Sequence, residues 1–277
     1  MLAVQSFCLK DQLTADMHGT IRQLHEIGFD SFEPFIVFDG KQGKKPGHLF
    51  SFERLAQVKP LLDSLGMAMP TAHAGIGYGS FFMPTGRIIR NIKKVHEEYG
   101  IRYFVVGGLF ANARGAQKWA KVCSAVAEGL RGSGCTLVYH NHDVEFTKIS
   151  VKGRTITAMD YFMELVGPEV MLQPDIGWAA NGSDEVAFVK KYAHRIVSLH
   201  LKDLKEGSNT HTAKNMPTEM FTPIGEGRVR TREILQMMDS FPNLQGRLVI
   251  DQDRSAGDMM ADMKRSFDHI QSMLAGE

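Results

Sequence analysis

The sequence predicts a single (β/α)8 barrel, a TIM barrel, over residues 1–277. Apolar, strand-like runs alternate with amphipathic helical runs in about eight units, which favours a closed barrel over an open sheet. Neither a Pro/Ser-rich linker nor a low-complexity tract separates the units. Clusters of histidine and carboxylate residues directly follow several of the later strand-like runs. This pattern is typical of a barrel whose strands bring functional side chains together at one end.

The first half of the chain contains strands and helices in regular order. The expected strands cover residues 2–6, 31–35, 67–72 and 101–106. The expected helices, which carry apolar residues every three or four positions, cover residues 15–27, 52–65 and 87–99. Gly28, Gly66 and Gly100 directly follow these helices, where glycine commonly caps a helix C-terminus.

The second half repeats the alternation. The expected strands cover residues 136–139, 170–172, 196–201 and 248–250. The expected helices cover residues 117–130, 158–166, 184–192, 231–238 and 258–274. Longer connections are expected at 39–48, 143–157 and 205–230, and those that follow strands would lie on the active-site face. No G-x-G-x-x-G pattern follows the first strand, which argues against a dinucleotide-binding fold.

Composition and charge limit the partners of this chain. Hydrophobic residues make up 43% and charged residues 23%, as in an ordinary globular protein with a sizeable core. The 32 basic and 31 acidic residues nearly cancel and form no basic stripe, so we expect no nucleic-acid partner. The three cysteines are odd in number and share no metal-binding spacing, which argues against a disulfide framework. No apolar segment of membrane-spanning length and no signal peptide is evident, so we expect a soluble, cytoplasmic protein.

Four residues are candidate ligands of one divalent metal. His140, Asp175, His200 and Asp251 each end an expected strand, and their spacing allows one ligand on each of four consecutive strands. Mixed nitrogen and oxygen ligation suits Mn²⁺, Co²⁺, Zn²⁺ or Mg²⁺, and two imidazoles make Mg²⁺ the least favoured of these. The alternative is that each residue is an isolated polar end of a strand, although four in succession favour the metal site.

Three further residues near these strand ends could take part in catalysis. His142 and Lys202 each follow a candidate ligand by two positions and therefore face the same side of the strand. Lys202 could stabilise a negatively charged oxygen of the substrate, or could form an ion pair with Asp253 or Asp175. Glu145 lies beyond the strand end, where it could carry a proton or could be an exposed loop carboxylate.

Other residues are candidate substrate contacts. His73 and Glu33 lie at the ends of the third and second expected strands, where they could line a pocket or play a structural role. Trp178 could provide an apolar platform for a sugar ring or could be a packing residue of the core. His142 is a further candidate contact on the same face as His140.

The chain resembles a known family in six segments. They are VQSF at 4–7, IGFDSFE at 27–33, YHNHDVEF at 139–146, DIGW at 175–178, HLKD at 200–203 and DQD at 251–253. Together they resemble the sugar phosphate isomerase/epimerase family, whose fold is the xylose isomerase-like TIM barrel. The resemblance spans essentially the whole chain.

This resemblance implies one divalent metal at the carboxyl ends of the strands, bound by residues that match His140, Asp175, His200 and Asp251. Better-studied epimerases of the group have glutamates at the positions of His140 and Asp251, where they serve as ligands and as an acid–base pair. Histidine can still transfer protons near neutral pH. Asp251 is one methylene shorter than glutamate, which shortens its reach toward a substrate carbon.

The expected function is that of an isomerase or epimerase that acts on a keto or aldo sugar. A metal bound to adjacent carbonyl and hydroxyl oxygens would lower the pKa of the α-proton, and a base would remove that proton to give a metal-stabilised enediolate. The candidate bases are His140, His142, Glu145 and Asp251, and Lys202 would hold the developing oxyanion. Barrels of this kind often pair up, so a homo-oligomer is a further possibility by analogy.

Three alternatives remain open at this point. Loss of a β-hydroxyl from a keto-polyol such as an inosose would make the protein a dehydratase, a lyase. A related group of endonucleases uses the same barrel with three zinc ions, but it needs more ligands than this chain offers. Trp178 stands where a further histidine would be required, and the segment 205–230 contributes only His211. A non-catalytic, sugar-binding barrel is the third alternative.

Overall fold

The structure is a computed structural model that describes residues 1–38, 49–76, 84–208 and 212–276. The expected connection at 39–48 and His211 lie outside the described residues. Among the described residues, no helix is both long enough and apolar enough to span a membrane.

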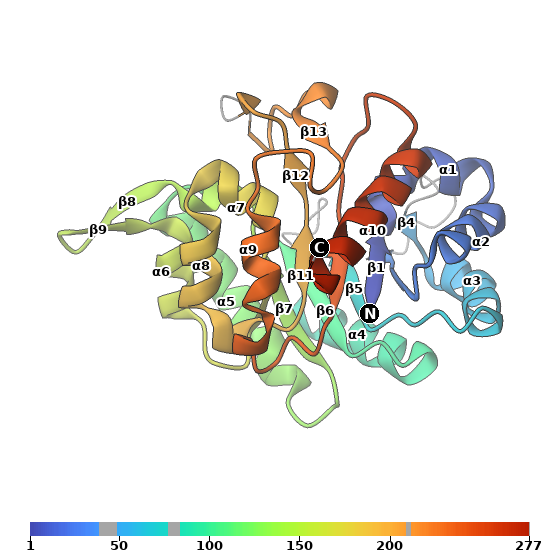
Figure 1. The fold of residues 1–277 in the computed structure, drawn as a ribbon. Helices are drawn as coiled ribbons and strands as arrows, with labels where there is room; N and C mark the ends of the chain where they lie inside the picture. Colours follow the sequence, from blue (N-terminus) through green and yellow to red (C-terminus); the bar gives the residue numbers. More distant parts are fainter. Residues whose placement is uncertain (39–48, 77–83, 209–211, 277) are drawn as a thin grey trace.

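The strands form a closed parallel barrel, which confirms the predicted fold class (Figure 1). One run of paired strands is β11-β14-β1-β2 and the other is β10-β7-β6-β5-β3-β4. Bridges between Leu172 and Ile196 and between Asp175 and His200 join β10 to β11. The barrel strands are β1 (Leu2–Gln5), β2 (Ser31–Glu33), β3 (Phe35–Val37), β5 (Thr71–Gly75), β6 (Tyr103–Gly107), β7 (Thr136–His140), β10 (Met171–Gln173), β11 (Leu199–Leu201) and β14 (Leu248–Ile250).

The second barrel strand is interrupted at Pro34. β2 pairs with β1 on one side, and β3 pairs with β5 on the other. Proline has no backbone N–H to donate to a neighbouring strand. The Pro34 carbonyl still accepts a hydrogen bond from the His73 backbone N at 2.9 Å. The strand therefore changes its partner at Pro34 without opening the barrel.

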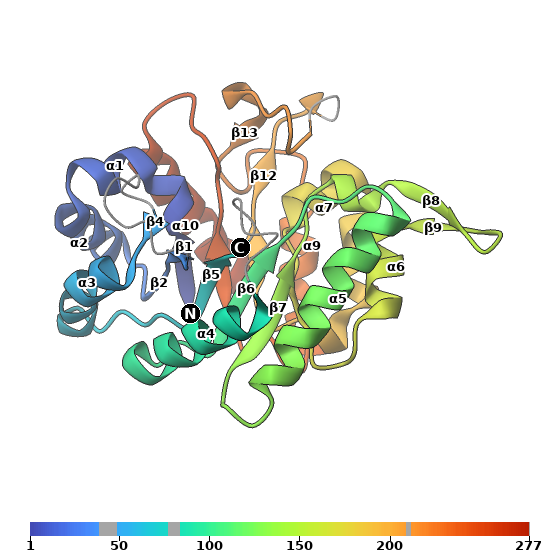
Figure 2. The same cartoon turned by 180° about the vertical axis from the view of Figure 1, so that it is seen from behind.

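Helices form an outer layer around the barrel (Figures 1 and 2). Most begin at a side chain that accepts a hydrogen bond from the first turn, for example Asp16, Asn112 and Asp258. The helices are α1 (Lys10–Ala15), α2 (Met17–Ile27), α3 (Phe52–Ser64), α4 (Thr85–Tyr99), α5 (Ala113–Leu130), α6 (Ala158–Leu165), α7 (Ile176–Gly182), α8 (Glu185–Lys191), α9 (Thr231–Gln236) and α10 (Met259–Ala275). All the helices that the periodicity predicts are present, with ends that shift by a few residues.

Two glycines have the backbone conformation expected of a helix cap. Gly28 has φ +120° and Gly100 has φ +73°, a region that residues with a Cβ rarely adopt. The Gly28 N–H donates to the carbonyls of Leu24 and His25 at the end of α2. The predicted helix ends at these two positions are therefore confirmed.

The structure differs from the sequence prediction in several connections. The third barrel strand lies at Thr71–Gly75 and not at 67–72, because Ala68 forms only a single bridge with Ser31. The expected loop 143–157 contains a hairpin that projects from the side of the barrel (Figure 1). Helices α1 and α7 were not predicted. The remaining short strands are β4 (Leu49–Phe50), β8 (Lys148–Val151), β9 (Arg154–Thr157), β12 (Asp203–Leu204) and β13 (Phe221–Thr222).

The layer between strands and helices is closely packed behind β7. The rings of Tyr139 on β7 and Phe162 on α6 lie 4.3 Å apart between centroids, and both are wholly buried. Tyr139 directly precedes His140, so this contact supports the strand end that carries a candidate site residue.

Substitution of Phe162 by alanine is expected to lower the free energy of unfolding by about 3–5 kcal/mol, because it leaves a cavity against Tyr139. Leu165→Ala on the same helix removes a side chain that is 41% exposed and should change stability by less than about 0.5 kcal/mol. Urea unfolding of both variants checks this prediction. Equal losses would show that α6 does not pack on β7 as described.

Candidate active site

A cavity of about 380 Å³ opens at the carboxyl ends of the barrel strands. This volume lies within the range that holds small molecules. The side chains that give its floor a polar character are His73, His140, His142, Lys202, Asp251 and Asp253. Four different strands or strand ends supply them, which is how a parallel barrel assembles a site.

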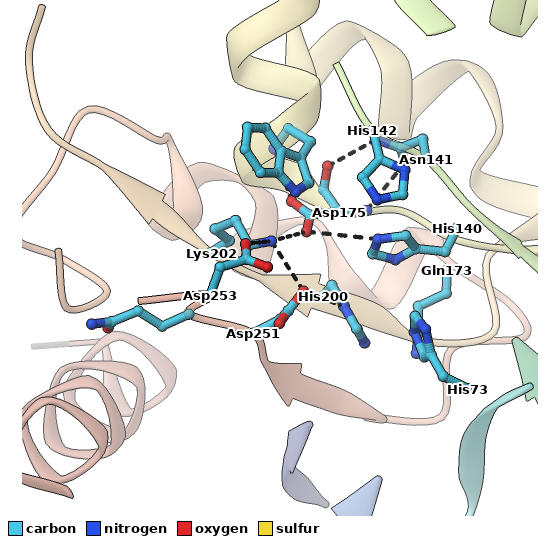
Figure 3. Close-up of polar contacts among 12 residues, drawn as sticks. His73, His140, Asn141, His142, Gln173, Asp175, His200, Lys202, Asp251 and Asp253 are labelled. Carbon is cyan, nitrogen blue, oxygen red and sulfur yellow. Dashed lines mark hydrogen bonds and ion pairs between the residues drawn. The ribbon is translucent and has the colours of Figure 1, made fainter. Parts of the chain in front are cut away.

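The four residues expected to ligate a metal come together in one buried group (Figure 3), and two of them, His140 and Asp251, line the cavity. One possible ligand atom from each of His140, Asp175, His200 and Asp251 lies within 4.8 Å of the others, and all four residues are buried. His73 forms an overlapping group with His140 and His200. The ring of His73 lies 5.1 Å from that of His200, so this expected substrate contact sits beside the candidate ligands.

Glu33 lies behind this group and not in the cavity. Its side chain is wholly buried, and Oε1 accepts a hydrogen bond from His200 Nε2 at 2.7 Å. Gln173 donates from Nε2 to Glu33 Oε2 at 2.8 Å, and Thr71 donates to the same oxygen. The expectation that Glu33 contacts substrate is therefore replaced by a role as support for His200. A carboxylate that binds the far nitrogen of an imidazole is the usual environment of a metal-ligating histidine.

Asp175 and Asp251 each have one oxygen held away from the centre of the group. Asp175 Oδ1 accepts from the Trp178 backbone N at 2.8 Å, as the N-cap of α7. Asp251 Oδ1 lies 3.3 Å from the thiol sulfur of Cys8. The second oxygen of each carboxylate therefore faces the cluster.

Lys202 lies among three carboxylates at the edge of the group (Figure 3). Its Nζ is 2.9 Å from Asp175, 3.0 Å from Asp251 and 2.6 Å from Asp253. Burial by itself lowers the pKa of Lys202, but these carboxylates raise it well above its ordinary value. Both ion pairs that the sequence left open for Lys202 are thus present.

Negative charge exceeds positive charge in this buried cluster. Four carboxylates, those of Glu33, Asp175, Asp251 and Asp253, stand against two positive groups, the ammonium of Lys202 and the imidazole of His200. Burial raises the pKa of Asp175 to about 6. Burial lowers the pKa of His200, yet Glu33 and Asp251 raise it to about 10. The cluster thus favours bound positive charge, and its two imidazoles and two carboxylates fit a divalent cation.

His140 presents a neutral imidazole to the group. Its Nε2 lies 4.0 Å from Asp175 Oδ2, and burial lowers the pKa of His140 well below its ordinary value. Within the described parts of the chain, His140 Nδ1 is buried without a hydrogen-bond partner. A neutral imidazole with a lone pair is the form that binds a metal.

His142 and Glu145 form a pair at the cavity wall. His142 Nδ1 donates to the Gly108 carbonyl at 3.2 Å, since a carbonyl can only accept, and its Nε2 then carries the free lone pair. Glu145 is wholly buried behind it and accepts from the His142 backbone N at 3.2 Å and from the Tyr139 hydroxyl at 3.0 Å. Burial lowers the pKa of His142, but the hydrogen bond and charge of Glu145 raise it overall. Glu145 therefore contacts His142 and is not the exposed loop carboxylate that the sequence also allowed. That it carries a proton stays a prediction.

Trp178 lines the cavity although only 2% of its surface is exposed. Lys202 Nζ lies 4.8 Å from the centre of its ring, a cation–π distance. The indole thus serves as packing and as cavity wall, the two roles that the sequence left open.

Sequence reasoning missed two polar residues that shape the site. Gln173 accepts from His73 Nε2 at 3.1 Å and donates to Glu33, so it fixes both side chains. Its position two residues before Asp175 places it on the same face and could have revealed it. Cys8 contacts Asp251 from a 3-10 turn, η1 (Ser6–Leu9), that no sequence signal indicated.

Comparisons with known proteins agree with the barrel fold. A model of the xylose isomerase-like TIM barrel family matches residues 21–273. The fold is similar to a sugar phosphate isomerase/epimerase from Parabacteroides distasonis, with a TM-score of 0.78 and 19% identity over 98% of this chain and 93% of that chain. A search of curated proteins found no match.

Two further solved structures share the fold. One is a xylose isomerase-like TIM barrel protein from Mycobacterium smegmatis in complex with magnesium, with a TM-score of 0.65 and 13% identity over 97% of this chain and 91% of that chain. The other is the probable 3-DHS dehydratase AsbF from Bacillus anthracis, with a TM-score of 0.68 and 13% identity over 98% of each chain.

Glu33→Gln is expected to weaken metal binding by about 10- to 100-fold. The neutral amide removes the negative charge that Glu33 holds beside His200 Nε2. Titration of Mn²⁺ or Zn²⁺ against a chromophoric chelator measures the Kd. Asp63→Asn, on the exposed face of α3, is the matched control and should bind as the wild type does. Unchanged affinity in Glu33→Gln would contradict the supporting role of Glu33.

Proposed function

Since this chain belongs to the xylose isomerase-like TIM barrel family, we propose that it is a divalent-metal-dependent isomerase or epimerase acting on a keto or aldo sugar. The observation that carries the proposal is the convergence of His140, Asp175, His200 and Asp251 in one buried group, of which His140 and Asp251 line a cavity of small-molecule size. The P. distasonis sugar phosphate isomerase/epimerase with the same fold supports the reaction class.

The proposed metal ligands are these four residues. When bound, a divalent metal would polarise the carbonyl of the sugar and acidify the neighbouring C–H bond. Two imidazoles favour Mn²⁺, Co²⁺ or Zn²⁺ over Mg²⁺. Glu33 would keep the Nε2 hydrogen on His200 and so direct the Nδ1 lone pair into the group.

His142 is the proposed base. Its Nε2 carries a lone pair at the cavity wall, and the bond from Nδ1 to Gly108 fixes that tautomer. The ring takes the proton from the carbon beside the carbonyl, and the electrons of the C–H bond form a C=C double bond. The negative charge that then develops on the former carbonyl oxygen faces the ammonium of Lys202. Return of the proton from His142 to the former carbonyl carbon, with transfer of the neighbouring hydroxyl proton to the former carbonyl oxygen, isomerises the sugar. Epimerisation needs a second acid that delivers a proton to the opposite face of the same carbon, where His142 does not reach.

Dehydration of a keto-polyol is the second candidate. Asp251 is bound by Lys202 and His200 and contacts Cys8, so it is poorly placed to act as a second base. Chemistry that needs only one base is favoured for that reason. His142 could pass the α-proton to a β-hydroxyl, which would leave as water. AsbF, a probable dehydratase with this fold, is consistent with such a reaction.

The proposed reaction predicts metal-dependent exchange of a substrate α-proton. We expect plasma mass spectrometry to find about one metal per chain, and NMR in deuterated water to detect deuterium uptake by keto-sugars or inososes. His142→Gln should keep the metal and lose exchange by about 10²- to 10⁴-fold, the usual contribution of a positioned base. His25→Gln, an exposed substitution on α2, should retain both.

Two outcomes would contradict the proposal. Full exchange in His142→Gln would remove His142 as the base. Sugar binding by a wild type that takes up no metal and catalyses no exchange would leave the non-catalytic, sugar-binding barrel as the better description.

Glu145 is the proposed positioning residue for His142. Glu145→Gln keeps the shape of the side chain and removes the charge behind the imidazole, so we expect kcat to fall about tenfold with KM unchanged. Steady-state kinetics on the substrate found by the exchange screen separates the two constants. Glu164→Gln, at an exposed position on α6, is the matched control. A rise in KM with constant kcat would indicate that Glu145 shapes only the binding site.

A further inference from the structure

Beside its polar side chains, the cavity is lined by a group of large apolar side chains, here called the apolar wall. Phe7, Phe35, Leu109, Trp119 and Met216 line this wall. They come from separate parts of the chain: η1, β3, the segment after β6, α5 and the segment before β13. Because five separate segments contribute to this wall, it is formed by the fold as a whole and not by one loop.

Two glycines admit the aromatic rings of this wall. A Cβ on Gly75 would lie 2.9 Å from a ring carbon of Phe35. A Cβ on Gly108 would lie 2.5 Å from the indole of Trp119. Glycine at such positions commonly marks a close approach of another group to the backbone. At Gly75 and Gly108, the absence of a side chain therefore leaves room for the rings of Phe35 and Trp119.

Leu109 extends the wall to the surface. It is 49% exposed, which makes it one of few large apolar side chains that the described structure leaves in water. An exposed apolar side chain that continues a cavity wall is a common sign of a binding site. A sugar ring alone offers hydroxyl groups that this wall cannot hydrogen-bond, because none of these five side chains except the Trp119 indole carries a polar atom.

The charges of the described residues that line the cavity do not suit a phosphate group. Within the described parts of the chain, Lys202 is the ammonium that lines the cavity, and no arginine does. Lys202 is already bound to three carboxylates. A phosphate dianion at the floor would meet Asp251 and Asp253, which repel it.

We propose that the substrate is an unphosphorylated sugar that carries an aryl group, with the sugar on the polar floor and the aryl group against the apolar wall. This inference rests on the proposed function, which it narrows to one class of substrate. An aryl ring has the flat, apolar faces that pack against Phe7, Phe35 and Leu109.

Calorimetric titration of the metal-loaded protein with matched glycosides tests this inference. The probes are phenyl and methyl glycosides of glucose, galactose and mannose, together with the corresponding sugar 6-phosphates. We expect the preferred phenyl glycoside to bind at least tenfold more tightly than its methyl counterpart, and the phosphate to bind no better than the free sugar. Leu109→Ala should reduce the phenyl preference severalfold. Leu274→Ala, which removes a leucine that is 43% exposed on α10, should leave it unchanged.

Three results would overturn the inference. Equal affinity for phenyl and methyl glycosides would show that the wall does not hold an aryl group. Tighter binding of the sugar phosphate than of the free sugar would show that the site supplies a positive charge for the phosphate group. Sedimentation that shows a dimer dissociated by Leu109→Ala would assign the exposed leucine to a second copy of this chain. Under each result, α-proton exchange with unsubstituted sugars would still be measurable, so failure here is distinct from failure of the proposed function.

Discussion

The site depends on the excess of buried negative charge around Lys202. Four carboxylates face one ammonium and the imidazole of His200, whose pKa is raised to about 10, in a place that water scarcely reaches. The remaining uncompensated charge costs several kcal/mol. The raised pKa of His200 is one consequence, because Glu33 and Asp251 favour its protonated form. Burial raises the pKa of Asp175, and the charge of Asp251 adds to that rise. A divalent cation held by the same donors would meet this need. The charge balance therefore links the fold of the strand ends to the proposed chemistry.

Local structure holds these charged groups in place. Asp175 is the N-cap of α7 through one oxygen and faces Lys202 through the other, so the start of a helix sets the direction of a candidate ligand. Glu33 is held by Gln173 and Thr71 and in turn holds His200. Such supported side chains keep their geometry without a substrate, which is what catalysis by a preorganised site requires.

The sequence correctly predicted those features of the site that depend only on the order of the strands. Parallel strands all end on one side of the barrel, so His140 at the end of β7 and His200 within β11 were expected to meet, and they do. Glu33 and Glu145 were misplaced for local reasons. The break at Pro34 accompanies the burial of Glu33 beneath His200, and the 3-10 turn Val144–Phe146 directs Glu145 behind His142. The apolar wall with Trp119 was missed because a tryptophan in an amphipathic helix reads as core.

The most direct test of this account is a crystal structure of the protein grown with Mn²⁺ or Zn²⁺, with data collected at the absorption edge of the metal. The account predicts one strong anomalous peak within contact distance of His140, Asp175, His200 and Asp251. A peak at any other place would contradict it. So would the absence of a peak, with the ammonium of Lys202 still between Asp175 and Asp251, since Lys202 alone would then compensate the buried carboxylates.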